Sequence, residues 1–482
     1  MSTAAPPAKR VKPNAPKKLK LKKYKPARID PTSSEGVLRR NIADIWPEAT
    51  PNDMTAFMNR DRSAPWPLHK RLENLEIVGL ASNGSGLAMD AGLGRVVLVP
   101  FTLPGDVVNV QVYRTEEFYL EAELREVVKP SSNRSDELVR CQYFGKCGGC
   151  QYQNTPYDNQ LAIKRTVVAN AYRFFAPNVA LPEIGSTVPS PSQYGYRTKL
   201  TPHFDVPKKT GLTSPDFPIG FGQKGRKELL DIEECVIGTK VVNRGIAVER
   251  ERAHANYANF KRGVTFLIRE AENEELVLDP RQIMREKVGP YVFEYKAGEF
   301  FQNNNSILPV VTSYVSEALK ISRDGGEPQP PQFLVDTYCG CGLFAISCSG
   351  QAERVIGVEI SAQNVEFART NAKLNSVSNA EFVVGQAEKI FENVSGIDAS
   401  QTAVVIDPPR KGCDDVFLNQ LLEFGPAKVV YVSCNVHSQA RDLEYFLGKA
   451  AGAYEVESLR GFDFFPQTYH VEGVAVLKRT TQ

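Results

Sequence analysis

Two short apolar runs near the C-terminus, each ending in an abrupt polar or proline-rich turn, constrain the fold more than any other part of the chain. Residues 404–406 lead into Asp407-Pro-Pro-Arg410, and residues 429–432 lead into Ser433-Cys434-Asn435. Apolar runs of this length suit strands buried on both faces of a parallel sheet. Because ligands in open α/β sheets lie beyond the carboxyl ends of the strands, we expect Asp407 and Cys434 to lie where chemistry takes place.

The segments around these runs alternate between strand and helix patterns. FLVD at 333–336, VIGVEI at 355–360 and FVVG at 382–385 are strand-like, and the residues between them are typical of helices. The chain ends in VESLRGFDFFP and HVEGVAVLKR, which predict an antiparallel pair at the sheet edge. We therefore expect residues 299–482 to form a doubly wound, Rossmann-like α/β domain.

Upstream of this domain the pattern is different. Short alternating runs separated by glycine and proline predict a small β-barrel of the TRAM or OB type over residues 66–135. Residues 136–298 combine a cysteine motif with a β-rich central domain, in which aromatic and basic residues interleave as RNA-binding surfaces do. We interpret residues 1–65 as a basic disordered arm followed by a linker.

The charge of the chain is concentrated at its start. The first 30 residues carry ten Lys or Arg and a single acid, a net +9, which leaves −7 for the remainder because the total is +2. Such an arm attracts polyanions or directs nuclear import, or it only solubilises the chain. With no apolar stretch long enough to span a membrane and no export signal, we expect the protein in the nucleus, the cytoplasm or both. We also expect it to be a monomer.

The central segment contains the motif Cys141-x5-Cys147-x2-Cys150, with two glycines between the last two cysteines. Three cysteines in ten residues have the density of a metal site, and a fourth thiolate is available from Cys235. The residues alone leave an iron–sulfur cluster and a zinc ion as alternatives.

The loop after the first strand of the α/β domain predicts a nucleoside site. Asp336 ends the strand, the loop from Tyr338 to Gly342 contains Gly-x-Gly, and Glu359 ends the second strand. A glycine loop admits a nucleoside, and an acid on the second strand can bind both ribose hydroxyls. This arrangement fits NAD or S-adenosylmethionine, and the missing third glycine favours a cofactor without phosphate.

A cysteine beside a methyl donor has a specific use. Thiolate attack at C6 of uracil turns C5 into an enolate-like carbon that can accept a methyl group. A base must then remove the C5 proton. Glu472 is our candidate for this base, with His437 and His470 as alternatives.

Several motifs in order resemble the RNA uracil-5-methyltransferase family, which is class I and uses S-adenosylmethionine. They are FFQNN at 300–304, DTYCGCG, DPPRKG, SCN and TYHVE. The segment from IVGLASNGSGLA to VLVPFTLPGD is similar to the TRAM barrel of that family, and CQYFGKCGGCQYQ is similar to the iron–sulfur segment of its rRNA-modifying branch.

The resemblance implies a role for each matching residue. Cys434 would be the nucleophile and Glu472 the proton acceptor. Contacts to S-adenosylmethionine would come from Gln302, Tyr338, Glu359 and Asp407, with Asp407 and Gln302 also close to the target base. A 4Fe-4S cluster, or zinc in its place, would be held by Cys141, Cys147, Cys150 and Cys235. The chain departs from the family at Leu343, where an asparagine is common, and at Ser438, where a threonine is common.

The expected activity is formation of 5-methyluridine in RNA, and the basic arm favours tRNA over rRNA as the substrate. Two alternatives remain open. One is a non-covalent methyltransferase acting on a base nitrogen, although Arg410 stands where such enzymes carry an aromatic residue. The other is an RNA chaperone that uses the barrel, the arm and the central domain without catalysis.

Overall fold

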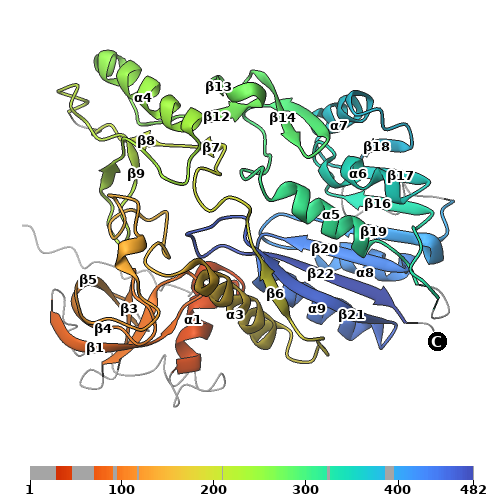
Figure 1. Cartoon of the computed structure of the whole chain (residues 1–482), viewed down its shortest axis with the longest axis horizontal. Coiled ribbons are helices and arrows are strands. Elements are labelled where there is room, and N and C mark those ends of the chain that lie inside the picture. Colours follow the sequence, from red (N-terminus) through yellow and green to blue (C-terminus); the bar gives the residue numbers. More distant parts are fainter. Residues whose placement is uncertain are drawn as a thin grey trace, which may run out of the picture.

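The structure is a computed structural model that describes residues 29–45, 70–90, 95–116, 119–208, 210–322, 326–385 and 396–480. It contains a β-barrel, a central domain and a large α/β domain (Figure 1). The predicted fold class is thus confirmed. In the described part of the chain, no helix is long and apolar enough to cross a membrane.

The N-terminal barrel is closed by five strands in the order β1-β2-β3-β5-β4. The strands are β1 Arg71–Leu80, β2 Gly86–Asp90, β3 Arg95–Val99, β4 Val107–Thr115 and β5 Tyr119–Lys129. Valine and leucine side chains of alternating positions fill its interior, including Val97, Val108 and Val110, all fully buried. The β-branched alternation therefore folds as the sequence predicts.

A helix precedes the barrel where the sequence predicts a linker. Helix α1 spans Ser34–Ile45 and buries Val37, Leu38 and Ile42. Our interpretation of residues 1–65 as arm and linker is wrong for this stretch, because three apolar side chains are too few for a clear helical period. The basic arm up to residue 28 and the segment TAFMNR lie outside the described residues.

The central domain follows helix α3, Tyr157–Phe175, and strand β6, Gly185–Val188. It consists of short strands around one helix, α4 Lys240–Ala255, which the prediction of a β-rich domain did not include. The strands are β7 Lys199–Leu200, β8 His203–Phe204, β9 Gly220–Gly222, β10 Leu229–Asp231, β11 Val264–Thr265, β12 Ile268–Ala271 and β13 Glu275–Val277. Thr239 caps α4 by accepting a hydrogen bond from the Val242 backbone N–H.

A hairpin of β14, Ile283–Val288, and β15, Tyr291–Lys296, connects the central domain to the α/β domain. Asn371 Oδ1 accepts from the Glu294 backbone N–H at 2.7 Å, and Asn375 Oδ1 accepts from that of Val292 at 2.8 Å. The inward side of the hairpin, including Phe293, shares one hydrophobic core with the large sheet. The hairpin therefore packs with the α/β domain.

The α/β domain is built on an eight-stranded sheet in the order β18-β17-β16-β19-β20-β22-β21-β6. Its strands after β6 are β16 Phe333–Thr337, β17 Arg354–Glu359, β18 Ala380–Val384, β19 Thr402–Ile406, β20 Lys428–Ser433, β21 Tyr454–Phe462 and β22 Glu472–Arg479. The five strands from β18 to β20 are parallel, and β22 pairs antiparallel with both β20 and β21. Strand β6, from far upstream, forms the outer edge.

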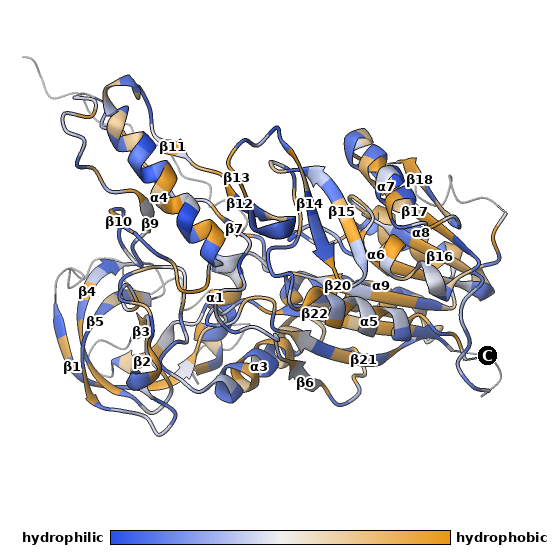
Figure 2. Ribbon diagram, turned by 45° about the horizontal axis from the view of Figure 1, so that its top comes forward, coloured by the Kyte–Doolittle hydropathy of each residue, from blue (hydrophilic) through white to orange (hydrophobic). Residues whose placement is uncertain are grey.

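Helices cover both faces of this sheet, so its strands are buried on both sides. Successive residues of β19 alternate between the two cores: Val405 lies in one and Val404 in the other. On one face lie α5 Leu308–Ala318, α6 Leu343–Ser347 and α7 Ala362–Leu374; on the other lie α3, α8 Asp415–Phe424 and α9 Val436–Ala450. Figure 2 shows hydrophobic residues along the strands of the sheet.

Candidate active site

Three of the predicted site residues meet at one end of the sheet. Asp407 follows β19 and Cys434 follows β20, at the same carboxyl edge. Strand β22 runs the opposite way, and its pairing of Gly473 with Ser433 brings Glu472, its first residue, beside Cys434. Because β22 is antiparallel, its first residue, Glu472, lies at the same edge of the sheet as the ends of the parallel strands β19 and β20.

Electrostatic coupling joins these groups. Burial, followed by the charges of Glu472 and Asp407, raises the pKa of the Cys434 thiol to about 12. Burial and the Asp407 charge raise the pKa of Glu472 to about 8, and desolvation raises that of Asp407 to about 7. Arg410 opposes these shifts: its charge and its hydrogen bond to the thiol lower the pKa of Cys434, and its charge lowers that of Glu472.

The turns that carry Asp407 and Cys434 are bonded to each other. Asn435 Nδ2 donates to the Arg410 carbonyl at 2.9 Å, and Ser438 Oγ lies 3.1 Å from the same oxygen. Ser438 Oγ also donates to the Asn435 carbonyl at 2.9 Å. Both contacts use only the hydroxyl of Ser438. They do not need the methyl group that the threonine common in the family would add.

The other end of the edge carries the residues expected at the cofactor. Glu359 accepts hydrogen bonds from the backbone N–H groups of Gly340, at 3.2 Å, and Ser361, at 2.9 Å. Gly342 has a φ of +94°, which a residue with a side chain adopts only with strain. A half-buried carboxylate held beside a glycine loop fits a nucleoside with ribose hydroxyls.

Tyr338 directly follows β16, and Gln302 lies in the loop between β15 and α5. Tyr338 has a φ of +62°, and its ring packs against that of Phe417 in a T-shaped arrangement, with centroids 5.5 Å apart. Gln302 is half-buried in a loop whose next residues are anchored: the Thr198 N–H donates to the Asn303 carbonyl at 3.0 Å, and Asn304 Nδ2 donates to the Phe464 carbonyl at 2.9 Å. No hydrogen bond among the described residues joins Gln302 to Cys434 or Asp407.

Two residues near the start of α6, Leu343 and Asp336, are buried and make structural contacts. Leu343, where the family commonly has asparagine, is buried in the core between the sheet and its helices. Asp336 is also buried, and its Oδ2 accepts from the Ala345 N–H at 2.8 Å. Desolvation raises the pKa of the Asp336 carboxyl well above its usual range.

The histidines considered as alternative bases are poorly suited to that role. Burial lowers the pKa of both His437 and His470 to about 4, and the charge of Arg410 contributes at His470. A group with so low a pKa accepts a proton weakly at neutral pH, whereas Glu472 holds one readily. The geometry and charge therefore favour Glu472.

The four cysteines of the central segment converge from two parts of the chain. Burial is the main cause that raises the pKa of the Cys147, Cys150 and Cys235 thiols. The charge of Cys141 adds to it in all three, and the Cys235 charge adds to it in Cys150. Cys147 forms an isolated antiparallel β-bridge with Gln223, the residue after β9. Their donor chemistry fits a thiolate-bound centre. Within the described ranges, however, no three His, Cys, Asp or Glu side chains are arranged to hold a metal ion.

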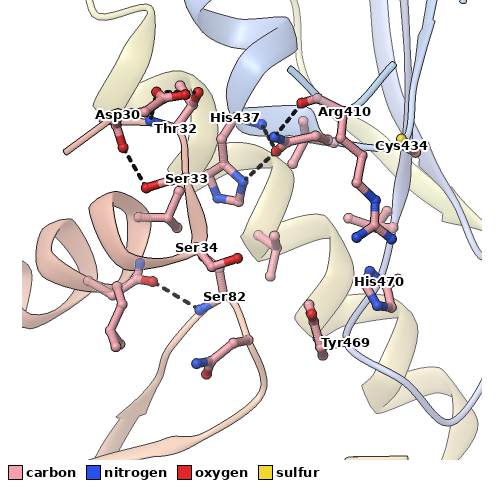
Figure 3. A pocket seen from close by; sticks show the side chains of 18 of the residues that line it. Asp30, Thr32, Ser33, Ser34, Ser82, Arg410, Cys434, His437, Tyr469 and His470 are labelled. Atoms are coloured by element: carbon pink, nitrogen blue, oxygen red, sulfur yellow. Dashed lines mark hydrogen bonds between the residues drawn. The ribbon is translucent and has the colours of Figure 1, made fainter. Parts of the chain in front are cut away.

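The structure also places near the thiol residues for which the sequence analysis predicted no such position. Arg410 contacts the thiol, and Tyr469 and His470, whose ring centroids lie 4.1 Å apart, line the pocket at Cys434 (Figure 3). The position of Arg410 directly after Asp-Pro-Pro was a usable signal. No sequence pattern predicted the placement of Tyr469.

The chain is similar to known proteins over most of its length. A family model described as tRNA (uracil-5-)-methyltransferase matches residues 250–480, and the TRAM domain model matches residues 72–124. The tRNA (uracil(54)-C(5))-methyltransferase of Saccharomyces cerevisiae is 44% identical over 96% of this chain and 84% of its own length. The protein of the same name from Schizosaccharomyces pombe is 47% identical over 86% of this chain and 80% of its own length.

A solved structure shows the same fold. The crystal structure of Pyrococcus abyssi tRNA (uracil-54, C5)-methyltransferase with S-adenosyl-L-homocysteine has a TM-score of 0.61 and 24% identity, covering 85% of this chain and all of that one. Motifs, sheet-edge geometry and relatives of this identity lead to one conclusion. The chain belongs to the tRNA (uracil-5-)-methyltransferase family.

Proposed function

We propose that the protein transfers a methyl group from S-adenosylmethionine to carbon 5 of uridine 54 in tRNA, through a covalent Cys434–uracil adduct. The names of the two yeast relatives support the substrate and the position. The observation that carries the mechanism is the joint placement of Cys434, Asp407 and Glu472, three coupled groups at one end of the sheet.

The first step needs the Cys434 thiolate, which adds to C6 of the uracil. Arg410 favours the thiolate through its charge and its hydrogen bond. The negative charges of Asp407 and Glu472 disfavour the thiolate. Burial reduces this effect, because it keeps part of Asp407 and most of Glu472 in the protonated form near neutral pH. Protonated Asp407 can donate a hydrogen bond to a uracil oxygen on which charge develops.

S-adenosylmethionine supplies the electrophilic methyl group that C5 accepts. Glu472, as a carboxylate, then takes the C5 proton; the electrons of that C–H bond restore the C5–C6 double bond, and the bond from C6 to sulfur breaks. Cys434 leaves as a thiolate and regains a proton. The net products are 5-methyluridine, S-adenosylhomocysteine and one proton.

The proposal is tested with a tRNA transcript and isotopically labelled S-adenosylmethionine. Digestion to nucleosides should yield labelled 5-methyluridine, and a transcript with cytidine at position 54 should yield none. Cys434→Ala should abolish the product, while Cys348→Ala, which removes a buried thiol away from the sheet edge, should retain it. A nucleoside methylated on nitrogen, or full activity of Cys434→Ala, would support the non-covalent alternative instead.

A role as an RNA chaperone is separable from this chemistry. The closed barrel and the TRAM match support RNA binding by the N-terminal part. Strand annealing that persists in the double variant Cys434→Ala, Glu472→Ala would establish such a role beside catalysis.

The cysteine cluster is the second part of the proposal. We propose that Cys141, Cys147, Cys150 and Cys235 hold a 4Fe-4S cluster, with zinc as the alternative, since all four are thiols coupled to one another. A cluster absorbs visible light and a zinc site does not. A colourless, metal-free protein after anaerobic purification would refute both. We further propose a monomer acting in the nucleus or cytoplasm, testable by light scattering and by imaging the tagged protein.

A further inference from the structure

A cavity of about 360 Å³ extends from Cys434 to helix α1 (Figure 3). Cys434 and Arg410 line one end, and Asp30, Thr32 and Ser33 lie at the other. The cavity is not lined by Asp407 or Glu472, the carboxyl groups proposed to act on the target base. Nor is it lined by the other residues expected at the cofactor, which are Gln302, Tyr338 and Glu359. The cavity therefore leads from the thiol away from the cofactor.

Helix α1 is fixed as the far wall of this cavity. Leu38 and Ile42 pack into a core with the barrel, and Val37 packs into the core under α3 and α9. Asn41 Oδ1 accepts from the Ser82 N–H in the barrel at 3.0 Å, and Arg441 on α9 donates to Thr32 Oγ1 at 3.2 Å. The wall is thus tied both to the barrel and to the α/β domain. It lies outside the segments that the two family models match.

His437 lines the cavity, and its buried Nε2 is a hydrogen-bonding atom left without a partner among the described residues. Its side chain is 9% exposed, and its Nδ1 lies 3.3 Å from Asn435 Oδ1. That oxygen can only accept, because the Asn435 amide nitrogen donates to the Arg410 carbonyl. Nδ1 therefore carries the proton, and Nε2 is an acceptor that has no partner among the described residues.

The remaining lining suits a nucleotide. Arg410 and Lys411 supply positive charge for a phosphate, and the rings of Tyr469 and His470 supply surfaces for a base. Ser34 and its neighbours supply hydroxyl groups. The volume falls at the lower end of the ~300–1,000 Å³ typical of sites for small ligands, which is enough for one nucleotide beyond the atoms at the thiol.

We propose that this cavity receives the base of a nucleotide adjacent to the target uridine, with α1 as its far wall and His437 Nε2 as an acceptor for a base N–H. The proposal rests on the proposed function, because it needs the target uracil at Cys434. It makes residues 30–45 a specificity element of the tRNA site, and it couples the barrel to the catalytic edge.

The test is to narrow the cavity from the α1 side. Ser34 is exposed and lines the cavity, so Ser34→Trp places an indole there without opening a core. Asp44→Trp is the matched control: Asp44 is exposed on the same helix, does not line the cavity, and has only an exposed ion pair with Arg173 to lose. Three transcripts are compared: the intact tRNA, and tRNAs with an abasic site on either side of the target.

On the intact transcript, kcat/KM of Ser34→Trp should fall about tenfold, the range of one lost base contact, and that of Asp44→Trp should remain. On one of the abasic transcripts the ratio of wild type to Ser34→Trp should return to within about twofold, because the base that clashes is gone. An equal loss on all three transcripts, or no loss on any, overturns the proposal.

A second variant keeps the test independent of the indole. His437→Phe retains a ring but removes the acceptor, so it should lower kcat/KM on the intact transcript and not on the same abasic transcript. Thermal melting of each variant separates this from a folding defect, and an equal effect of His437→Phe on both transcripts counts against the acceptor role. If the wild type makes no 5-methyluridine on any transcript, the proposed function fails, which is a distinct result.

Discussion

Replacing Glu472 by glutamine should separate the two halves of the reaction. The side chain is 5% exposed and glutamine has the same shape, so the change removes a proton acceptor without opening a cavity. Burial is the main cause of the raised pKa of the Cys434 thiol and the Glu472 charge adds to it, so removal of that charge does not slow attack on C6. Loss of a general base slows the later step by about 10²–10⁴-fold. Methylated RNA should therefore accumulate bound to the protein.

The assay follows both species in one experiment. Protein, tRNA and labelled S-adenosylmethionine are mixed, and samples are run on a denaturing gel that resolves the covalent complex from free RNA. Glu472→Gln should carry label in the complex while releasing little 5-methyluridine. Glu455→Gln, an exposed change on the neighbouring strand, is the control and should turn over normally. Turnover of Glu472→Gln within about tenfold of wild type, with no labelled complex, would refute Glu472 as the base.

Three further outcomes follow from the same geometry. In the wild type, the rate at which the methylated adduct breaks down should rise with pH and level off above about 8, because this step needs Glu472 ionised and its pKa is raised to about 8; a flat profile from pH 6 to 9 contradicts this. Arg410→Ala should slow adduct formation about tenfold and move its pH dependence upward, since the cation that lowers the Cys434 pKa is lost; rapid-quench kinetics would show no shift if Arg410 only bound RNA. Lys164→Met leaves the fully buried Asp463 carboxylate without its cation and should lower the free energy of unfolding by ~3–5 kcal/mol; an unchanged urea midpoint would refute this.

The strand ends of the α/β domain could be predicted because their signal is local. An apolar run followed at once by Asp407 or by Cys434 fixes both the strand and the edge where its last residue lies. Glu472 could be predicted as a candidate, but its approach to the thiol depends on the antiparallel pairing of β22 with β20, which the order of the chain does not reveal.

Features made by distant segments were missed for the same reason. Helix α1 buries one side against the barrel and another against α3 and α9, so its few apolar residues show no regular period. Strand β6 joins the sheet beside β21, more than 250 residues later in the chain. Arg410 was visible in the motif, yet its action on the thiol depends on the tertiary placement of β19 beside β20.

The most direct measurement concerns the bond between protein and RNA. A tRNA with 5-fluorouridine at the target position should form a stable complex, because a base cannot remove fluorine as it removes a proton. After digestion, mass spectrometry of the complex should find the nucleotide, with its transferred methyl group, on the peptide that contains Cys434. Attachment at another residue, or methylation of normal tRNA by a protein that never forms the complex, would contradict the covalent mechanism.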